Sequence, residues 1–532
     1  MSANFSPYAH SEREKYFWPA AFLMLVGWGA VLLQGGYAHY EGQFFLANYV
    51  DERDAFSTIF SAHHNEWDCY QGRELSFLFG WLDAQAVVAG ARFGAPHLYS
   101  VTHFAGLIVI AVMLWRLLPG LFAGVDRTLS GLIVCLLLSS PVASLSGFYY
   151  RPAKVLAAVF LVIALGQVNA LMRPRGTDTR AQWQLLLLVI SATLMGMSDR
   201  LGVYLVLLTG VMVIIAGPIA RAVRVLLALG IALAANIVWS VAVGPRLSFL
   251  ADGFLPDTTD QRVRLRFSFF DIDHYGPALS LWLDHVSQYF GNFGTYAASC
   301  IVIGMAVALW KRREDSSRPL IGKEFVMLSA GVLASIALYV AMYARLESLV
   351  WPASRRVYYW LPQLVCIAVA TAAALGRVRV KNHRLARVVT PLLAVLILAN
   401  FVALPGHRTA VRSQEHAPWI AESGRLRSCM SASTTAVASY GLSAPAAQIC
   451  GAVRVAARGT AGPGQQVPVA KANPVLYCRK SGRMRDRVDR GKFYSRPVRG
   501  FRAMQERRPR AGGAEADVLV AQRSHFRFSC GV

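Results

Sequence analysis

Long apolar runs separated by polar connections dominate residues 1–405 of the chain. A helix needs about 20 apolar residues to cross the hydrocarbon core of a bilayer. The alternating ten-residue pattern of a membrane β-barrel is absent. We therefore expect an all-α polytopic integral membrane protein with about eleven transmembrane helices. The expected spans are 17–36, 103–122, 129–148, 153–172, 183–197, 201–219, 223–244, 289–310, 325–343, 357–375 and 388–405.

The composition supports this class and limits the partners. Hydrophobic residues make up 55% of the chain and charged residues 16%, too few polar groups to cover a soluble protein of this size. The formal net charge of +24 suggests nucleic-acid binding at first sight. However, most of the basic residues lie in short clusters between apolar runs, and no zinc-finger, RRM or helix-turn-helix pattern stands out. We expect membrane lipids as partners and no nucleic acid.

Basic residues mark every second connection, as the positive-inside rule requires. With the N-terminus in the cytoplasm, the C-terminus lies outside, and we expect a bacterial inner membrane. The pattern favours two spans within 183–219, broken at Ser198-Asp199-Arg200, because a single span would invert all later loops. No cleavage site follows 17–36, so this run is expected to be a retained signal anchor. The inner-loop residues are Arg116, Arg127, Arg173, Arg175, Arg180, Arg221, Arg224, Lys311, Arg312, Arg313, Arg377, Arg379, Lys381, Arg384 and Arg387.

The chain is expected to divide into three parts. Residues 1–404 form the membrane domain, with a long first outer loop at 37–102, and residues 405–478 form a small extracytoplasmic segment. The basic tail, 479–532, is expected to be disordered and to hold no functional site. It could instead bind anionic lipids, or be a frame-shifted reading of the gene.

Four cysteines follow the last span, namely Cys429, Cys450, Cys478 and Cys530. An oxidising outer compartment permits disulfides among them, with three pairings open. No CxxC is present, which argues against a zinc site.

The first outer loop carries an adjacent carboxylate pair, Asp51-Glu52. A carboxylate near the membrane face can accept a proton from a hydroxyl as that hydroxyl attacks an electrophile. The lower dielectric there raises the pKa of a carboxylate and makes it a better base. The alternative is a solvated helix start in which Asp51 is an N-cap. Residues 55–62, which follow, are expected to form a short amphipathic helix on the membrane surface.

Beyond that helix the sequence continues as Tyr70-Gln71-Gly72-Arg73-Glu74-Leu75. Together with Val50-Asp51-Glu52, this arrangement resembles the GT-C superfamily of polytopic glycosyltransferases. The resemblance implies transfer of a sugar from a polyprenyl-phosphate carrier to a glycan, lipid or protein acceptor at the outer membrane face. It also implies Asp51 or Glu52 as the catalytic base, with Tyr70, Arg73 and Glu74 binding substrate. Glu74 stands where some relatives carry Pro, and the long spacing from the first span keeps Glu41 as a rival base.

A lipid-phosphate leaving group requires cations at the outer face. The predicted substrate-binding cations are Arg151, Lys154, Arg200, Arg355 and Arg356. Arginine suits phosphate because its planar fork donates two parallel hydrogen bonds. The alternative for each cation is pairing with lipid phosphates or with Asp199, Asp271 or Glu347 across helices.

We expect no cofactor and no metal site, although the sequence leaves a divalent cation open. His63-His64 with Glu66 and Asp68, and Asp271 to His274, contain metal-binding side chains without a recognised spacing. No phosphate-binding glycine loop is present, which argues against an ATP-driven pump. A transporter or flippase, and a non-catalytic membrane protein, are the alternative functions. No internal repeat supports a transporter.

Overall fold

The computed structural model describes 46–50, 54–61, 72–93, 101–122, 124–140, 143, 153–172, 178–199, 201–216, 219–253, 272–289, 361–381, 388, 391–400, 402–403, 425–426, 428–430, 437–440, 442 and 444–458. The chain divides into two compact units, residues 1–465 and 466–532. The second unit lies outside the described residues, as do the expected spans 17–36 and 325–343 and nearly all of 289–310.

All regular structure in the described residues is helical, and no strand occurs there. Four helical stretches are long and apolar enough to cross a membrane: Val101–Leu121, Ala153–Met172, Thr179–Ser198 and Arg221–Ala251. The shorter apolar helices are Arg127–Ser139, Leu201–Val211 and Pro391–Asn400. Every one of these helices overlaps an expected span, while the total of about eleven spans stays a prediction.

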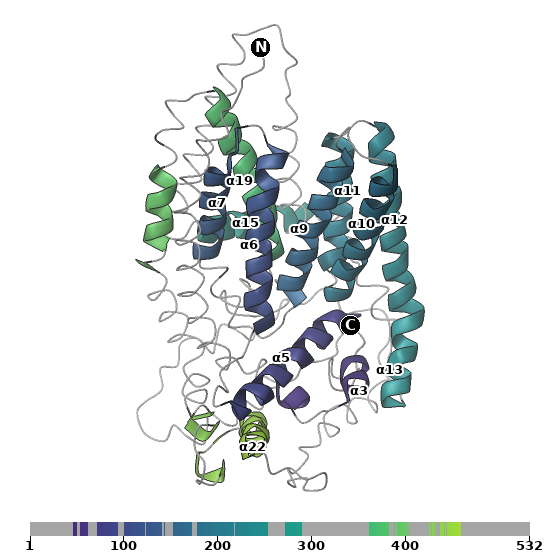
Figure 1. Cartoon of the computed structure of the whole chain (residues 1–532), viewed down its shortest axis with the longest axis vertical. Coiled ribbons are helices and arrows are strands. Elements are labelled where there is room, and N and C mark those ends of the chain that lie inside the picture. Colours follow the sequence, from purple (N-terminus) through teal and green to yellow (C-terminus); the bar gives the residue numbers. More distant parts are fainter. Residues whose placement is uncertain are drawn as a thin grey trace. The chain divides into compact units, whose positions relative to one another are not determined.

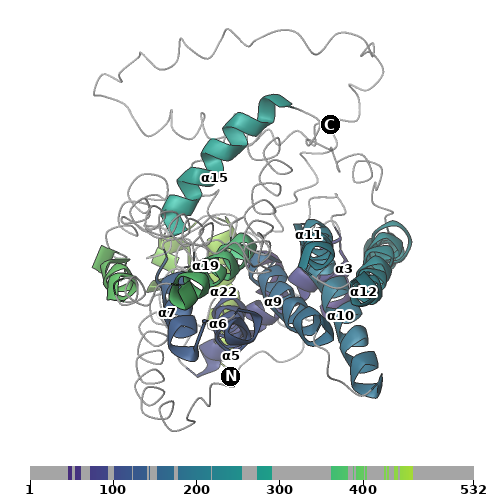
Figure 2. The same ribbon diagram turned by 90° about the horizontal axis from the view of Figure 1, so that it is seen from above.

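Helix α9 (Ala153–Met172) packs against α6 (Val101–Leu121), α10 (Asp178–Ser198), α11 (Leu201–Ala216), α12 (Ile219–Val238) and α19 (Leu361–Lys381). Helix α7 (Arg127–Ser139) packs against α6 and α19. In Figures 1 and 2, α9, α10 and α12 run side by side. Their facing side chains form one apolar core. Leu, Ala and Val make up most of this core, and the many Ala residues let the helices approach closely.

The expected break within 183–219 is present as a sharp turn between α10 and α11. Helix α10 ends at Ser198, and α11 begins at Leu201. The Asp199 side chain accepts a hydrogen bond from the Leu201 backbone N–H at 2.9 Å, and the Gly202 N–H donates to the Asp199 carbonyl at 2.8 Å. Asp199 therefore caps the start of α11.

Helix α12 continues without a loop through a π-helical turn, η2 (Trp239–Val243), into α13 (Gly244–Asp252). The apolar stretch Arg221–Ala251 has 31 residues. At 1.5 Å per residue it is about 46 Å long, so it exceeds the roughly 30 Å of a hydrocarbon core. Helix α13 packs against α3 (Ala55–Phe60) from the first outer loop.

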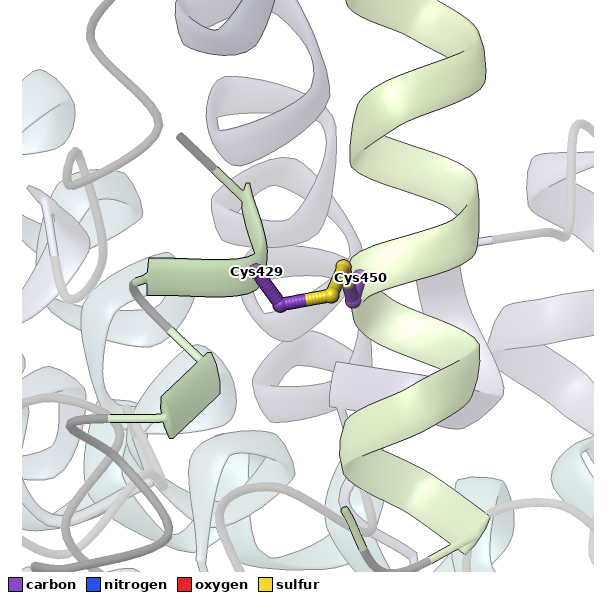
Figure 3. Close-up of a disulfide and its surroundings, with 2 residues drawn as sticks. All are labelled: Cys429 and Cys450. Atoms are coloured by element: carbon purple, nitrogen blue, oxygen red, sulfur yellow. A yellow bond between two sulfur atoms is a disulfide. The ribbon is translucent and has the colours of Figure 1, made fainter. Parts of the chain in front are cut away.

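A second apolar core lies apart from the bundle core. It joins helical residues 46–50, α5 (Glu74–Arg92) and α22 (Ala444–Arg458). Figure 3 shows the disulfide between Cys429 and Cys450 in this core. The first outer loop and the segment after the last span therefore pack together, with one of the disulfides that an oxidising compartment permits.

Basic residues gather where other helix ends meet. Arg379 pairs with Asp126 at 2.7 Å, and Arg221 donates to the Met172 carbonyl at the C-terminus of α9, also at 2.7 Å. A cation at a helix C-terminus interacts favourably with the helix dipole. These four groups come from α9, α12, α19 and the N-cap of α7. All of them lie next to or within the predicted inner loops.

Candidate functional site

The candidate site begins where the first outer loop enters α5. Gly72 has a φ of 61°, a left-handed conformation that glycine adopts without steric cost. This turn makes Arg73 the N-cap of α5 and Glu74 its first residue. Both side chains are buried, 5% and 4% exposed, so the loop places two adjacent opposite charges inside the protein.

Asp199 joins two cations from different elements. Its carboxylate lies 2.6 Å from the Lys154 Nζ, at the second residue of α9, and 3.5 Å from the Arg73 Nε. All three side chains are at most 6% exposed. The three residues, Arg73, Lys154 and Asp199, are called the ionic cluster below. It ties the start of α5 to α9 and to the turn between α10 and α11.

The charges in the ionic cluster depend on one another. Burial raises the pKa of the Asp199 carboxyl, but the charges of Lys154 and Arg73, the Lys154 hydrogen bond and the Leu201 N–H hydrogen bond together lower it by more. The net pKa lies well below its ordinary value, so Asp199 is ionised at neutral pH. Because both cations pair with the same carboxylate, loss of Asp199 would remove this counter-ion from both at once.

Glu74 reaches a different helix. Its Oε2 accepts a hydrogen bond of 3.0 Å from the indole Nε1 of Trp239, the first residue of the π-helical turn. π-Helical turns inside α-helices are frequent at functional sites. The starts of α5 and α9, the turn between α10 and α11, and the π-helical turn after α12 thus meet around Arg73 and Glu74.

This arrangement offers buried guanidinium and ammonium groups at helix ends. Such groups bind phosphate oxygens strongly because the surrounding dielectric is low and the hydrogen bonds are charge-assisted. A phosphate that approached the ionic cluster would compete with Asp199 for Lys154 and Arg73.

The sequence predicted three of the described residues at this site, namely Arg73, Glu74 and Lys154. The structure brings Arg73 and Lys154 together through Asp199, which is the ion pairing considered as the alternative role for such cations. The remaining predicted site residues lie outside the described residues: Asp51, Glu52, Tyr70, Arg151, Arg200, Arg355 and Arg356, together with the rival base Glu41.

Asp54 is the N-cap of α3, the short helix after the acid pair. Asp54 accepts hydrogen bonds from the backbone N–H groups of Phe56 and Ser57, at 3.0 and 3.2 Å, and from the Ser57 hydroxyl. The Ser57 hydroxyl, followed by these two backbone groups, lowers the pKa of the Asp54 carboxyl. Asp54 therefore stabilises the start of α3, while Asp51 lies outside the described residues and its capping alternative stays a hypothesis.

Sequence reasoning missed Asp83, a carboxyl buried on the inner face of α5 and 2% exposed. It accepts a 2.8 Å hydrogen bond from the Thr102 backbone N–H at the start of α6. Burial raises its pKa to about 7, although the Thr102 hydrogen bonds act in the opposite direction. The sequence signal that could have identified Asp83 is that it is the single acid among the apolar residues 75–91.

Metal binding gains no support in the described part of the chain. Nowhere in those residues do three or more His, Cys, Asp or Glu side chains come together in a way that could hold an ion. The sequence candidate around His63 lies outside that part, as does Asp271, whereas Ile272–His274 form a short 3-10 helix within it.

No protein-family model matches the chain, and no curated protein matches it. Among solved structures, ArnT from Cupriavidus metallidurans in the apo state is 12% identical, with a TM-score of 0.43 over 85% of this chain and 75% of ArnT. The Archaeoglobus fulgidus oligosaccharyltransferase, in complex with zinc and sulfate, is 14% identical, with a TM-score of 0.37 over 72% of this chain and 52% of its own. Both neighbours are GT-C proteins, the superfamily that the first outer loop resembles. Because both TM-scores are below 0.5, the function proposed below is argued from the residues of this chain and not from these neighbours.

Proposed function

We propose that this protein is a membrane glycosyltransferase that transfers a sugar from a polyprenyl-phosphate donor to an acceptor hydroxyl at the outer membrane face. The observation that carries the proposal is the ionic cluster. In it, Arg73, from the loop that resembles GT-C enzymes, and Lys154, one of the predicted outer-face cations, pair with the same carboxylate. Buried cations on the outer side oppose the positive-inside trend, so a function that requires them is favoured.

The proposed reaction is a single displacement at the anomeric carbon. Asp51 or Glu52 takes the proton of the acceptor hydroxyl, and the acceptor oxygen bonds to the anomeric carbon as the bond to the phosphate oxygen breaks. Attack opposite the leaving group inverts the configuration. Polyprenyl phosphate departs with the bonding electron pair, and Arg73 and Lys154 stabilise its charge.

Purified protein in liposomes, supplied with a panel of polyprenyl-phosphate sugars and acceptors, tests the proposal through the release of polyprenyl phosphate. Asp51→Asn and Glu52→Gln should abolish release if each acid is needed, while expression and membrane insertion stay normal. Asp54→Asn is the matched control, since asparagine also caps a helix and α3 should remain intact. Full activity in both acid variants would remove the pair as bases and direct attention to Glu41.

The break at Asp199 also favours a second candidate function. Buried charges at an interrupted helix are typical of transporters. A transporter or flippase would move a lipid-linked or polar substrate across the same liposomes without changing a covalent bond. Substrate movement without release of polyprenyl phosphate would therefore replace the transferase by this alternative.

A further inference from the structure

The residues that lead into the acid pair rest on the segment that follows the last span. Leu46, Ala47, Tyr49 and Val50 are buried, between 0 and 7% exposed, and Val50 immediately precedes Asp51 in the sequence. They share the second core with α22. The Gln448 Nε2 on α22 also donates a hydrogen bond of 3.0 Å to the Ala47 carbonyl, across 401 residues of chain.

The same helix supports α5. Ala84, Val87 and Ala91 on α5 are buried in the second core together with Ile449 and Val453 of α22. Arg73 and Glu74 stand at the other end of α5. Helix α22 therefore contacts residues 46–50, which precede the acid pair, and the C-terminal half of α5, whose first turn carries Glu74.

The disulfide holds this support together. Cys450 lies on α22 and Cys429 lies 21 residues earlier, and neither is exposed to solvent. In Figure 3 the bond joins α22 to the short helical piece around Cys429, within the packed core. A buried link of this kind restricts the alternative conformations of the segment it closes.

We propose that α22 is a positioning element for the first outer loop, and that oxidation of Cys429 and Cys450 is the condition under which it holds that loop in place. The catalytic part of this inference rests on the proposed transferase function. Two thiols exchange with a disulfide oxidant of the outer compartment, which leaves as two thiols and carries away both protons and both electrons. A reduced chain in the cytoplasm would thus lack a positioned acid pair.

Hydrogen exchange of the full-length protein tests the inference without reference to sugar transfer. In the double variant Cys429→Ser and Cys450→Ser, amides of residues 46–50 and of 84–91 should exchange at least about tenfold faster. Amides in the middle of α10 should be unchanged. Cys135→Ser, which removes a free thiol in α7, is the matched control and should leave all of these rates unaltered.

A milder variant keeps the test informative if the cysteine variant fails to fold. Gln448→Leu retains the size of the side chain but removes the donor to the Ala47 carbonyl, so exchange should accelerate at residues 46–50 and not in α10. Gln182→Leu, on the exposed side of α10, is its control. In an active preparation Gln448→Leu should lower kcat and leave KM unchanged, because it moves the base and not the donor-binding cations.

The outcomes distinguish the positioning role of α22 from the proposed transferase function. Unchanged exchange at residues 46–50 in Gln448→Leu would overturn the positioning role of α22, whatever the protein catalyses. Accelerated exchange in a protein whose wild type releases no polyprenyl phosphate would support the positioning role and remove the transferase. Accelerated exchange with kcat unaltered would show that the acid pair does not depend on this support and would overturn the catalytic part.

Discussion

Asp199 should contribute more to stability than Lys154 or Arg73, because both of these buried cations pair with it. Asp199→Asn would leave Lys154 and Arg73 without their common anion, and breaking a buried ion pair costs about 3–5 kcal/mol. We expect the free energy of unfolding to fall by that amount, measured by chemical unfolding in detergent. The control is Asp126→Asn, which weakens the partly exposed pair with Arg379. It should cost less than about 1 kcal/mol, and equal losses in both variants would contradict a special role for the ionic cluster.

Asp83 gives the protein a pH dependence of defined sign. Burial raises its folded-state pKa from 3.8 to about 7, so between these values the unfolded chain loses the proton while the folded chain retains it. The free energy of unfolding should therefore fall as pH rises from about 4 to about 7, and level off above that. Asp83→Asn keeps an acceptor for the Thr102 N–H and should remove this slope. A slope that persists unchanged in Asp83→Asn would assign the pH dependence to another titratable group.

These residues show what sequence could and could not predict. Lys154 was predicted at the outer end of a span because charge patterning marks helix ends. Arg73 and Glu74 were predicted from the loop motif. The burial of Asp83 was not, because it depends on a contact with the next helix, 19 residues further on. Likewise, the Trp239–Glu74 hydrogen bond spans 165 residues, and no local pattern reveals such a pairing.

The helices were predictable as elements, whereas their irregularities were not. Apolar length indicates a span, and α6, α9 and α10 lie where that length placed them. The π-helical turn in Trp239–Val243 has no signal in hydropathy, since its residues are as apolar as their neighbours. The turn depends on contacts with other elements. Trp239 donates a hydrogen bond to Glu74 of α5, and α13, which follows the turn, packs against α3.

The turn between α10 and α11 tolerates no side chain at Gly202. A Cβ there would lie 2.0 Å from the Met195 carbonyl oxygen, a backbone atom that cannot move aside cheaply. Gly202→Ala should therefore destabilise the protein by about 1–3 kcal/mol or more. Gly230→Ala in α12 is the control, because a Cβ there meets nothing within 4 Å. It should be neutral or stabilise the helix by up to about 1 kcal/mol, and equal thermal unfolding of the two variants would contradict the close approach at Gly202.

Considered as a whole, residues 1–465 contain two cores of different origin. The bundle core is made by apolar helices between residues 107 and 396, including α19, which packs against α7 and α9. The second core joins the first outer loop to residues 425–458, from opposite ends of the chain. Because α5 and α22 share that core, both segments must lie on the same side of any membrane that the bundle crosses. This conclusion agrees with the predicted sidedness, in which both are extracytoplasmic.

Labelling of single cysteines in intact cells decides that sidedness. The cysteines outside the disulfide are first replaced, and a membrane-impermeant thiol reagent is then applied. Ala89→Cys, on the exposed side of α5, should be labelled from outside. Arg180→Cys, exposed at the start of α10 in a predicted inner loop, should react only after the membrane is opened. The reverse result would place the ionic cluster in the cytoplasm, where no lipid-linked donor of the outer face could reach Arg73 and Lys154.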